Sequence, residues 1–537
     1  MKGKMKKVLA MGLAVSMMFA VMAGCGKTTE TSSSASSAVS TTETSTASTA
    51  EASKTPDISK EVTLKWMYHG STVTDDKRVM EKVNAYLKEK LNAKLEMIWC
   101  TWGDFDNKVQ LAISSGDDID IYFTSSWTPN DEYAAMAKKG NFIRLDKEDN
   151  NLLNQYAPNL FASLNPVLAD GAKTEGAEGM GIYGVPTYKE IAQQYTWDIN
   201  TNILKKYGYT VDDVKDFYDL GPMFEKIKAG EGKDYYPFSP EPQLLERMVN
   251  SNDLVDSNSL LSYEFDPVDP TKSATVIKSR YETEGYKKFC EKMREYFKKG
   301  YLSPEMSTKQ TADNARVTAQ GDATGVAKYA ISTQSYSPGY EFQTSKARKI
   351  DVVYKPSQTG IISTTSARGA MQAISSASKN PERALMFLNL VNTDPTLFTL
   401  LEYGIEGDHY KKESDGRVTF DDAKRATYNP WRAGMGKLSN LPVLSNEPAN
   451  LWELFDKFNN EAKPVPILGW AFDQEPVKTE IAALGNIVEE YRAPLSAGAV
   501  DPATKLPEFI KKLKANGIDK VTDEANKQLK AFLDAKK

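Results

Sequence analysis

Residues 61–124 contain three apolar runs, which read EVTLKWMYHG at 61–70, KLEMIWC at 94–100 and IDIYFT at 119–124. Apolar side chains alternate with others in the first run, which predicts a strand. Between the runs, apolar residues recur at helical spacing, first at Val79, Val83, Leu87 and Leu91 and then at Phe105, Val109 and Ala112. The order strand, helix, strand, helix, strand predicts an α/β fold built on a parallel, doubly wound sheet.

A second α/β block is expected from residue 194 to about residue 325. It begins with the strand-like Gln194–Asp198 and contains a helix over Gly285–Gly300, in which Tyr286, Phe289, Met293 and Phe297 share one face. Further helices are predicted after Asn380-Pro381, after Asp394-Pro395 and through most of the C-terminal region. A chain of 537 residues is too long for one compact core, so we expect at least two domains.

The first 25 residues have the features of a secretory signal that ends in a cysteine. Lys2, Lys4, Lys6 and Lys7 precede an uncharged apolar run over Val8–Ala23, and Gly24-Cys25 follows. The run is short for a transmembrane helix, which needs about 20 apolar residues. The sequence around Cys25 resembles the bacterial lipobox, in which the signal is cut before a cysteine that is then lipidated. We therefore expect a lipid-anchored protein on the extracellular side of the cell membrane.

The charge balance excludes some partners. The net charge is −5, and removal of residues 1–24 takes away four lysines and no acidic residue, which leaves −9. A nucleic-acid partner would need a basic face, so none is expected. The two histidines, His69 and His409, do not form a metal-ligand pair at helical spacing, and we expect neither a metal nor another cofactor.

The remaining cysteines are Cys100, at the end of an apolar strand, and Cys290, inside a helical segment. A disulfide between them is compatible with an exported protein, but we favour two buried free thiols. Residues 28–54 are rich in Ser, Thr and Ala and contain no aromatic residue. Such a segment buries too little surface to fold, and we interpret it as a flexible tether.

Several short patterns then occur in a characteristic order. They are Ser115-Gly116-Asp117-Asp118 before the strand at 119–124, Ser125-Ser126-Trp127 after it, Gly181-Ile182-Tyr183-Gly184-Val185-Pro186, and Ser378-Lys379-Asn380-Pro381-Glu382-Arg383-Ala384. Behind a lipobox, this set resembles the extracellular solute-binding proteins of the carbohydrate-uptake class, which are the receptors of ABC importers. The tail from Gly469-Trp470 to Gln528 resembles a C-terminal region of unassigned role found on a lipoprotein subgroup of the same family.

This resemblance implies a two-lobe fold of the type II periplasmic-binding-protein kind, with a ligand in the cleft between the lobes. It also implies a monomer that works with ABC permease subunits. The expected parts are a signal peptide at 1–24, a tether at 25–58, a first lobe at 59–190 plus 326–370, a second lobe at 191–325 plus 371–465, and a helical C-terminal region at 466–537.

Aromatic residues near strand ends are the first candidates for ligand contact. An indole stacks well on the apolar face of a sugar ring, while neighbouring polar groups bind the hydroxyls. Trp127 follows a parallel strand, with Ser126 and Asn130 beside it, and Trp102 also follows a strand. Tyr68 is expected to end the first strand and to face the same cleft. We place Trp431, in a loop after Asn429-Pro430, on the opposite wall formed by the second lobe. Each of these residues is also compatible with ordinary packing.

Polar candidates lie where the chain is expected to cross between lobes. Lys189 and Glu190 fall on the first crossing, where a carboxylate can accept hydrogen bonds from two sugar hydroxyls. The resemblance places Tyr329 after the second crossing and Arg368 at the third. Arg368 is expected either to bind the ligand or to tie the lobes together. For Lys189 and Glu190, the alternative to ligand contact is an ordinary solvent-exposed ion pair.

Three alternative functions remain open from the sequence. One keeps the fold and changes the ligand to a peptide or another small solute, and another makes the protein a ligand sensor. The third is a secreted glycoside hydrolase with two catalytic carboxylates, although 72 acidic residues make any chosen pair uninformative. No nucleophile elbow, HExxH motif or P-loop occurs in a fitting context, so we expect a receptor without catalytic residues.

Overall fold

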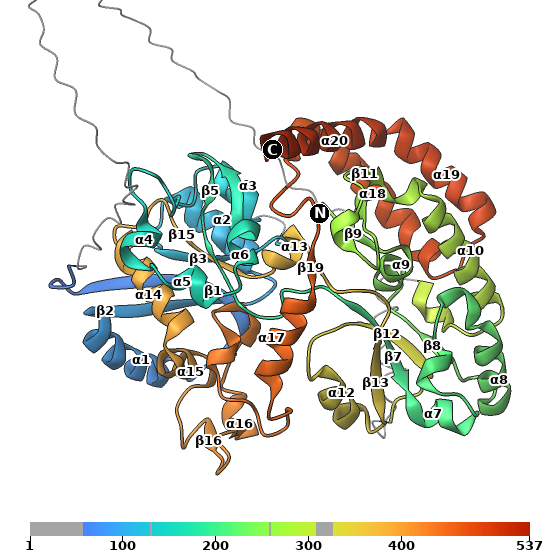
Figure 1. The fold of residues 1–537 in the computed structure, drawn as a ribbon, viewed down its shortest axis with the longest axis horizontal. Helices are drawn as coiled ribbons and strands as arrows, with labels where there is room; N and C mark the ends of the chain where they lie inside the picture. Colours follow the sequence, from blue (N-terminus) through green and yellow to red (C-terminus); the bar gives the residue numbers. More distant parts are fainter. Residues whose placement is uncertain (1–56, 129–131, 257–258, 308–325, 537) are drawn as a thin grey trace, which may run out of the picture. The chain divides into compact units, whose positions relative to one another are not determined.

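The computed structural model describes residues 57–128, 132–256, 259–307 and 326–536. Cys25, the expected tether up to residue 56 and Asn130 lie outside the described residues. Within the described part, two sheets form the centres of two lobes (Figure 1). Each sheet belongs to its own cluster of buried apolar residues, so each lobe has a separate hydrophobic core.

The first lobe contains the sheet that the three apolar runs predict. Its central strands are β1 (Val62–Val73), β2 (Ala93–Cys100) and β3 (Ile121–Thr124), and β1 pairs in parallel with both of the others. On the far side of β3, β15 (Met371–Ile374) and β6 (Val185–Pro186) add antiparallel strands. The end of β1 also pairs with β18 (Tyr428–Pro430), with Gly70 opposite Pro430.

Helices cover this sheet because their apolar faces match its hydrophobic surface. Between the strands lie α1 (Asp76–Leu91) and α2 (Phe105–Ser115), and α2 ends at Gly116, which adopts a left-handed conformation. The other helices of this lobe are α3 (Tyr133–Lys138), α4 (Leu152–Tyr156), α5 (Leu160–Ser163), α6 (Val167–Ala172), α14 (Pro381–Thr393), α15 (Pro395–Tyr403) and α16 (Asp422–Arg425). Two small hairpins, β4–β5 (Lys173–Gly176 and Gly179–Ile182) and β16–β17 (Tyr410–Lys412 and Val418–Phe420), complete it.

The second lobe is built on the sheet β13-β7-β12-β8, with the bounds Val352–Pro356, Tyr195–Asn200, Ile331–Ser335 and Phe238–Ser239. Between β8 and β12 in the sequence, β9 (Asn252–Leu254), β10 (Leu261–Glu264) and β11 (Ile277–Ser279) form a three-stranded antiparallel sheet. The helices are α7 (Thr201–Lys206), α8 (Gly221–Glu231), α9 (Pro242–Asn250), α10 (Glu284–Lys298) and α12 (Tyr340–Arg348).

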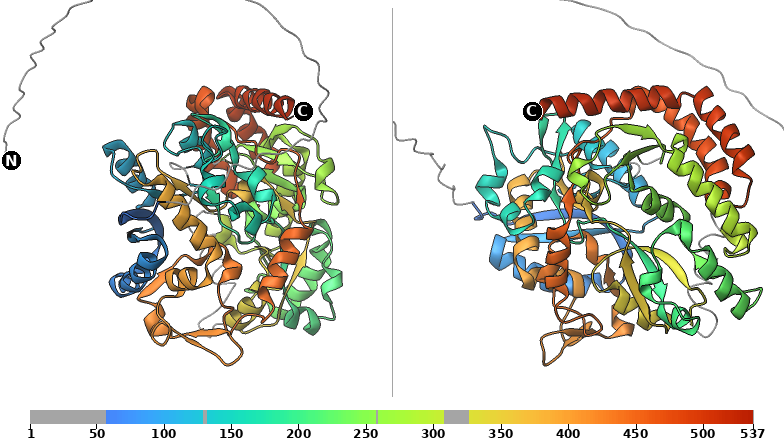
Figure 2. Two further views of the ribbon diagram at one scale, coloured as in Figure 1. Left: turned by 60° about the vertical axis from the view of Figure 1, so that its left-hand side comes forward. Right: turned by 45° about the vertical axis from the view of Figure 1, so that its right-hand side comes forward.

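The C-terminal helices α18 (Lys478–Ser496) and α19 (Pro502–Ala515) pack on the second lobe next to α10, and α20 (Ile518–Ala535) packs on these two helices and on β11 (Figures 1 and 2). Phe509 of α19 lies with its ring centroid 4.8 Å from that of Tyr281, and the hydroxyl groups of Ser496 and Tyr286 are 3.3 Å apart. The predicted C-terminal region therefore shares the core of the second lobe.

Three chain segments connect the lobes, at residues 187–194, 357–370 and 442–465. They run side by side, since Gln193 bridges to Ile361, and β14 (Ile361–Ile362) pairs in parallel with β19 (Lys463–Pro464). Helices α13 (Thr364–Ala367) and α17 (Leu451–Glu461) belong to the second and third of these segments. A small apolar cluster, which includes Leu168, Ile191 and Ala462, packs beneath them.

The expected assignment of residues 326–370 to the first lobe and 371–465 to the second is wrong. Strands β12 and β13 pair with β7 of the second lobe, whereas β15 pairs with β3 of the first. Sequence periodicity identifies these segments as strands but carries no information about their partners, which lie more than 100 residues away. The prediction for Cys100 and Cys290 is confirmed, because both are buried free thiols.

Among the helices of the described ranges, none alone is long and apolar enough to span a membrane. The pair α14 and α15, which bends by 87° at its break, meets the length and composition criteria only when taken together. Their apolar residues, which include Leu388, Leu397 and Leu401, belong to the core of the first lobe.

One carboxyl group in this core, that of Glu402, is buried without a hydrogen-bond partner among the described residues. Glu402, near the end of α15, is fully buried, and within the described part of the chain neither of its carboxylate oxygens has a hydrogen-bond partner. Burial raises the pKa of Glu402 to about 7, and Arg425 and Arg432 oppose the shift only in part. The folded protein therefore holds a proton on this group at a pH where the unfolded chain has released it.

We predict that Glu402 makes the protein less stable as the pH rises. Because the folded pKa lies above the unfolded value, its favourable contribution is present below about pH 4.5 and is lost through pH 7, at a cost of about 3 kcal/mol. Glu402→Gln should reduce the loss of unfolding free energy between pH 4.5 and pH 8 by about that amount. Urea unfolding at both pH values measures this, with the exposed Glu453→Gln as a control. An unchanged pH dependence would contradict the assignment.

Candidate ligand-binding site

Three indole rings gather at the carboxyl ends of the first-lobe strands. Trp127 follows β3, Trp102 lies in the turn between β2 and α2, and Trp431 follows β18. Their ring centroids are 5.8 Å apart for Trp102–Trp127, 5.3 Å for Trp102–Trp431 and 6.3 Å for Trp127–Trp431. We call these three residues the tryptophan cluster. The structure thus brings together three residues that are separated by up to about 330 positions in the sequence.

The cluster keeps much of its aromatic surface exposed. Trp102 is 49% exposed and Trp127 is 42% exposed, while Trp431 is half-buried. The planes of Trp102 and Trp127 are inclined by 30°, and Trp431 stands at 73° and 87° to them. Large exposed aromatic residues that meet at one place are characteristic of a binding surface, because a folded chain normally buries them.

Hydrogen bonds and close packing hold two of the rings in place. The Trp127 indole N–H donates to the carbonyl oxygen of Gly369 at 2.7 Å. Trp431 lies over Gly434, where an added Cβ would sit 2.4 Å from the indole ring and clash with the Tyr68 hydroxyl as well. Only glycine at position 434 therefore lets the Trp431 ring adopt this position.

Trp431 belongs to the first lobe, not to the second lobe as expected. The pairing of Gly70 with Pro430 joins its strand to β1 and places its ring centroid 5.0 Å from that of His69. The sequence marked the segment as a loop because of Asn429-Pro430 and gave no sign of a strand partner. As a result, all three indoles line one lobe.

Tyr68 lies beneath this surface instead of on it. Its side chain is fully buried, and its hydroxyl donates to the Trp431 carbonyl oxygen at 2.9 Å. The strand continues for five residues beyond Tyr68, so Tyr68 does not end it. Its position supports Trp431 from below.

His69 was not among the predicted site residues, yet it lies at the centre of the cluster. Its ring centroid is 3.8 Å from that of Trp102 and 4.1 Å from that of Phe123. Burial lowers the pKa of His69 to about 3, so the imidazole is neutral at ordinary pH. The only signal in the sequence was a polar residue directly after the apolar alternation of the first strand.

The polar candidates divide into two groups. Lys189 and Glu190 form an ion pair of 2.7 Å, and the Lys189 ammonium lies 3.7 Å from where a Cβ on Gly369 would be. Since Gly369 also accepts the hydrogen bond from Trp127, this ion pair borders the tryptophan cluster. Tyr340 of α12, in the second lobe, lies within electrostatic range of this pair, because burial and, to a smaller extent, the Glu190 carboxylate raise the pKa of Tyr340.

Ser126, Arg368 and Tyr329 have structural partners. The Ser126 hydroxyl donates to the Thr365 carbonyl oxygen at 2.8 Å. The Ser126 backbone N–H donates to the Arg368 carbonyl oxygen at 3.0 Å. Arg368 is fully buried and donates to the carbonyl oxygens of Gly171 (2.7 Å), Lys173 (2.6 Å) and Gly469 (3.0 Å). Tyr329 is also fully buried and donates to Asp198 at 2.7 Å inside the second lobe. The structure does not bring Arg368 or Tyr329 to the surface of the tryptophan cluster.

A group of possible metal ligands occurs elsewhere on the first lobe. Asp75, Asp408 and His409 have ligand atoms within 4.8 Å of one another. Arg78 already pairs with both carboxylates, and His409 Nδ1 accepts a hydrogen bond from the backbone N–H of Ile405 at 3.0 Å. A cationic side chain thus neutralises the acidic residues, and we interpret the group as an ion-pair junction between α1 and the loop at 404–409.

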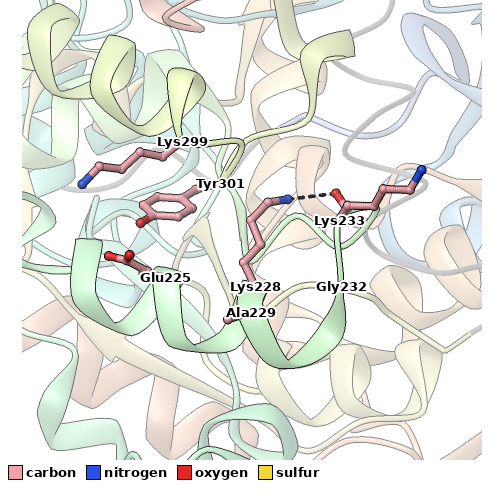
Figure 3. Close-up of a pocket in the computed structure, with 7 residues that line it drawn as sticks. All are labelled: Glu225, Lys228, Ala229, Gly232, Lys233, Lys299 and Tyr301. Atoms are coloured by element: carbon pink, nitrogen blue, oxygen red, sulfur yellow. Dashed lines mark hydrogen bonds between the residues drawn. The ribbon is translucent and has the colours of Figure 1, made fainter.

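An open depression on the second lobe offers a different surface (Figure 3). Its lining residues are Glu225, Lys228, Ala229, Gly232, Lys233, Lys299 and Tyr301. Lys228 donates to the carbonyl oxygen of Lys233 at 2.9 Å, so this ammonium group is already engaged. The depression shares no residue with the tryptophan cluster and is largely polar, and we do not place the ligand there.

A two-lobe α/β fold with three connecting segments and an exposed aromatic site on one lobe defines a solute-binding receptor. The family comparison agrees, because residues 70–396 match the family described as bacterial extracellular solute-binding protein. The chain belongs to this family, and the predicted family and fold class are confirmed. Residues 466–534 match a second family, described as a domain of unknown function (DUF3502).

Individual relatives extend over nearly the whole chain. A carbohydrate ABC transporter substrate-binding protein of Streptococcus pneumoniae serotype 4 is 28% identical over 491 residues, which cover 90% of this chain and 94% of the relative. The crystal structure of an N-glycan transport solute-binding protein (NgtS) from Streptococcus pneumoniae is 26% identical and covers 89% of this chain and all of its own, with a TM-score of 0.73. The same protein in complex with Man1GlcNAc has 25% identity, 88% and 100% coverage, and a TM-score of 0.65. These relatives are described as substrate-binding or solute-binding proteins.

Proposed function

We propose that this protein captures an uncharged oligosaccharide at the tryptophan cluster and delivers it to the permease of an ABC importer. The observation that carries the proposal is the meeting of Trp102, Trp127 and Trp431 at the strand ends of the first lobe, with two of the rings more than 40% exposed. In open α/β folds, ligands bind at the carboxyl ends of the strands.

The geometry of the cluster suits a sugar chain. A pyranose ring has apolar C–H faces and a hydroxyl rim, and an indole matches such a face with little loss of side-chain entropy. Because Trp431 stands nearly perpendicular to Trp127, at 87°, the cluster offers stacking surfaces in two orientations. Two orientations favour contact with more than one sugar unit, that is, with an oligosaccharide.

Polar groups at the edge of the cluster supply the second requirement. The Glu190 side chain is 24% exposed, and its carboxylate forms an ion pair with Lys189. The carboxylate can therefore accept hydrogen bonds from sugar hydroxyls without being an isolated charge. Tyr340 of the second lobe lies within electrostatic range of Glu190 and is 41% exposed. Hydroxyl groups bound between Glu190 and Tyr340 would contact both lobes at once.

Binding would then bias the hinge. The three connecting segments run side by side, which suits a hinge in which a few backbone dihedrals change. A ligand that contacts both lobes stabilises the closed arrangement by its additional contacts. To invert a 1:99 ratio of closed to open forms, those contacts must contribute about 5.5 kcal/mol.

The relatives support the ligand class. The Streptococcus pneumoniae relatives are described as a carbohydrate ABC transporter substrate-binding protein and as an N-glycan transport protein, the latter solved with Man1GlcNAc. The family is extracellular, which fits the signal-like residues 1–24 and the lipobox cysteine. We further propose that lipidated Cys25 holds the receptor as a monomer at the outer face of the membrane.

We predict that neutral oligosaccharides stabilise the mature protein. A panel of Man1GlcNAc, maltotriose, xylotriose and cellobiose, with digalacturonate and a tripeptide for comparison, can be screened by thermal shift and by quenching of tryptophan fluorescence. A sugar at 100 times its dissociation constant should add about 2.7 kcal/mol to the free energy of unfolding. Stabilisation by the tripeptide alone would contradict the proposal, and release of shorter sugars during incubation would indicate an enzyme.

We predict that Trp127→Ala weakens the binding of the best panel sugar more than tenfold while the melting temperature stays nearly unchanged, because the side chain is 42% exposed. Trp127→Phe keeps a stacking face but loses the hydrogen bond to Gly369, so its affinity for the sugar should lie between those of the wild type and Trp127→Ala. Leu111→Ala on α2, where Leu111 is 68% exposed, is the control. Isothermal titration measures all three, and wild-type affinity in Trp127→Ala would show that the site lies elsewhere.

We predict that Cys25→Ser abolishes retention at the membrane, because the thiol is the atom that carries the lipid. The variant should be found in the medium or as an uncleaved precursor, whereas Ser32→Ala in the tether should fractionate like the wild type. Immunoblots of membrane and medium fractions provide the measurement. Normal membrane retention of Cys25→Ser would rule out this anchor.

A further inference from the structure

His69 is the most unusual polar residue near the tryptophan cluster. It is only 1% exposed, and among the described residues neither Nδ1 nor Nε2 has a hydrogen-bond partner. Aromatic rings surround it, with centroid distances of 3.8 Å to Trp102, 4.1 Å to Phe123, 5.0 Å to Trp431 and 5.2 Å to Phe105.

Such an imidazole is costly to the empty protein. A neutral ring has one N–H donor and one acceptor nitrogen, and an unsatisfied buried polar group costs roughly 1–3 kcal/mol. A phenylalanine at this position would fill a similar volume without the cost. The position therefore fits a group that finds its hydrogen-bond partner outside the chain.

The other histidine shows the contrast. His409 is also fully buried, but its Nδ1 accepts a hydrogen bond from the backbone N–H of Ile405 at 3.0 Å, and its Nε2 lies 3.2 Å from Asp75. The protein thus supplies a hydrogen bond to one nitrogen of His409 and a nearby carboxylate to the other, although Nε2 makes no hydrogen bond among the described residues, whereas both nitrogens of His69 lack any polar neighbour of this kind. Only His69 of the two faces a candidate ligand surface.

Trp102 separates His69 from solvent. Its ring lies nearest to the imidazole and is itself 49% exposed, and it projects from the short turn at residues 101–104. Exposed side chains change rotamer on a picosecond-to-nanosecond timescale. A rotation of the Trp102 indole would remove the aromatic ring that lies nearest to the imidazole.

We propose that His69 forms the polar floor of the ligand site and hydrogen-bonds a hydroxyl or acetamido group of the bound sugar when Trp102 moves aside. This proposal rests on the proposed function and adds a residue that determines specificity. A neutral donor–acceptor pair suits a neutral sugar. It would not repay the desolvation of a uronate carboxylate, which needs a cationic partner.

The low pKa, about 3, supports this role, because the ring remains neutral and keeps both a donor and an acceptor throughout the range in which the receptor is assayed. Burial is the cause of the shift. A charged imidazolium would lack an acceptor nitrogen and would be unfavourable within a ring of aromatic side chains.

Nitrogen-15 NMR of the whole mature protein tests the contact directly, since the chain has two histidines and His409 serves as an internal control. On saturation with Man1GlcNAc, or with whichever other neutral panel sugar binds, one imidazole nitrogen of His69 should shift by several ppm. The His409 nitrogens should stay in place. If the His69 nitrogens move no more than those of His409, the inference is overturned although binding, and hence the proposed function, stands.

Substitution gives a second, independent measurement. His69→Phe should weaken binding of the neutral sugar about tenfold or more while the melting temperature of the empty protein stays equal or rises, because an unpaired polar group is removed. A merely structural histidine predicts the opposite pattern, with lower stability and unchanged affinity per folded molecule. His69→Asn, which keeps a donor and an acceptor, should recover part of the affinity.

The acidic sugar digalacturonate tests whether His69 makes the site favour neutral sugars. Digalacturonate should bind wild-type protein at least tenfold more weakly than the neutral sugar, and His69→Phe should change its binding little. Equal or tighter binding of digalacturonate would overturn the specificity assigned to His69. If no carbohydrate binds the wild type at all, both this inference and the proposed function fall together.

Discussion

The antiparallel contact between the end of β1 and β18 is the constraint on which the site depends. It places Gly70 opposite Pro430 and so joins segments about 360 residues apart. Through this contact Trp431 packs against His69, and the Tyr68 hydroxyl fixes the Trp431 backbone from below. Without it, Trp102 and Trp127 would form an aromatic pair on one side of the strand ends. With it, they become a three-sided surface around an imidazole.

The segment at 364–369 connects this surface to the rest of the molecule. The Gly369 carbonyl oxygen accepts from Trp127, and the Arg368 carbonyl oxygen accepts from Ser126, while the Arg368 guanidinium holds Gly171, Lys173 and Gly469. Gly469 lies within the C-terminal region, whose helices share the core of the second lobe. The backbone beneath the tryptophan cluster is therefore tied by a buried arginine to the region that follows the third connecting segment.

Two buried groups show where this fold gives up stability. Glu402 and His69 both lack hydrogen-bond partners among the described residues, and both have pKa values shifted toward the neutral form by burial. Both groups are linked to Tyr68. The His69 ring stacks on the Tyr68 ring, and the Glu402 charge contributes, after the larger effect of burial, to raising the pKa of Tyr68. His69 also adjoins the tryptophan cluster, and a buried polar group without a partner is expected at a functional site.

Residue spacing alone determined the local elements and the fold class. The alternation at 62–68 and the helical periods that follow were sufficient for the α/β fold, because strands and helices impose periods of 2 and 3.6 on their buried faces. The receptor family followed from the resemblance of the ordered short motifs behind the lipobox to a known family. Trp102, Trp127 and Trp431 could be chosen as candidates because large aromatic residues near strand ends are conspicuous. Tertiary structure decided the rest: which lobe residues 326–465 join, that Trp431 lies beside Trp127, that Arg368 and Tyr329 point inward, and that His69 is the centre. These outcomes depend on pairing between distant segments, and a strand's sequence encodes its pattern of buried faces but not the identity of the neighbour it will pair with.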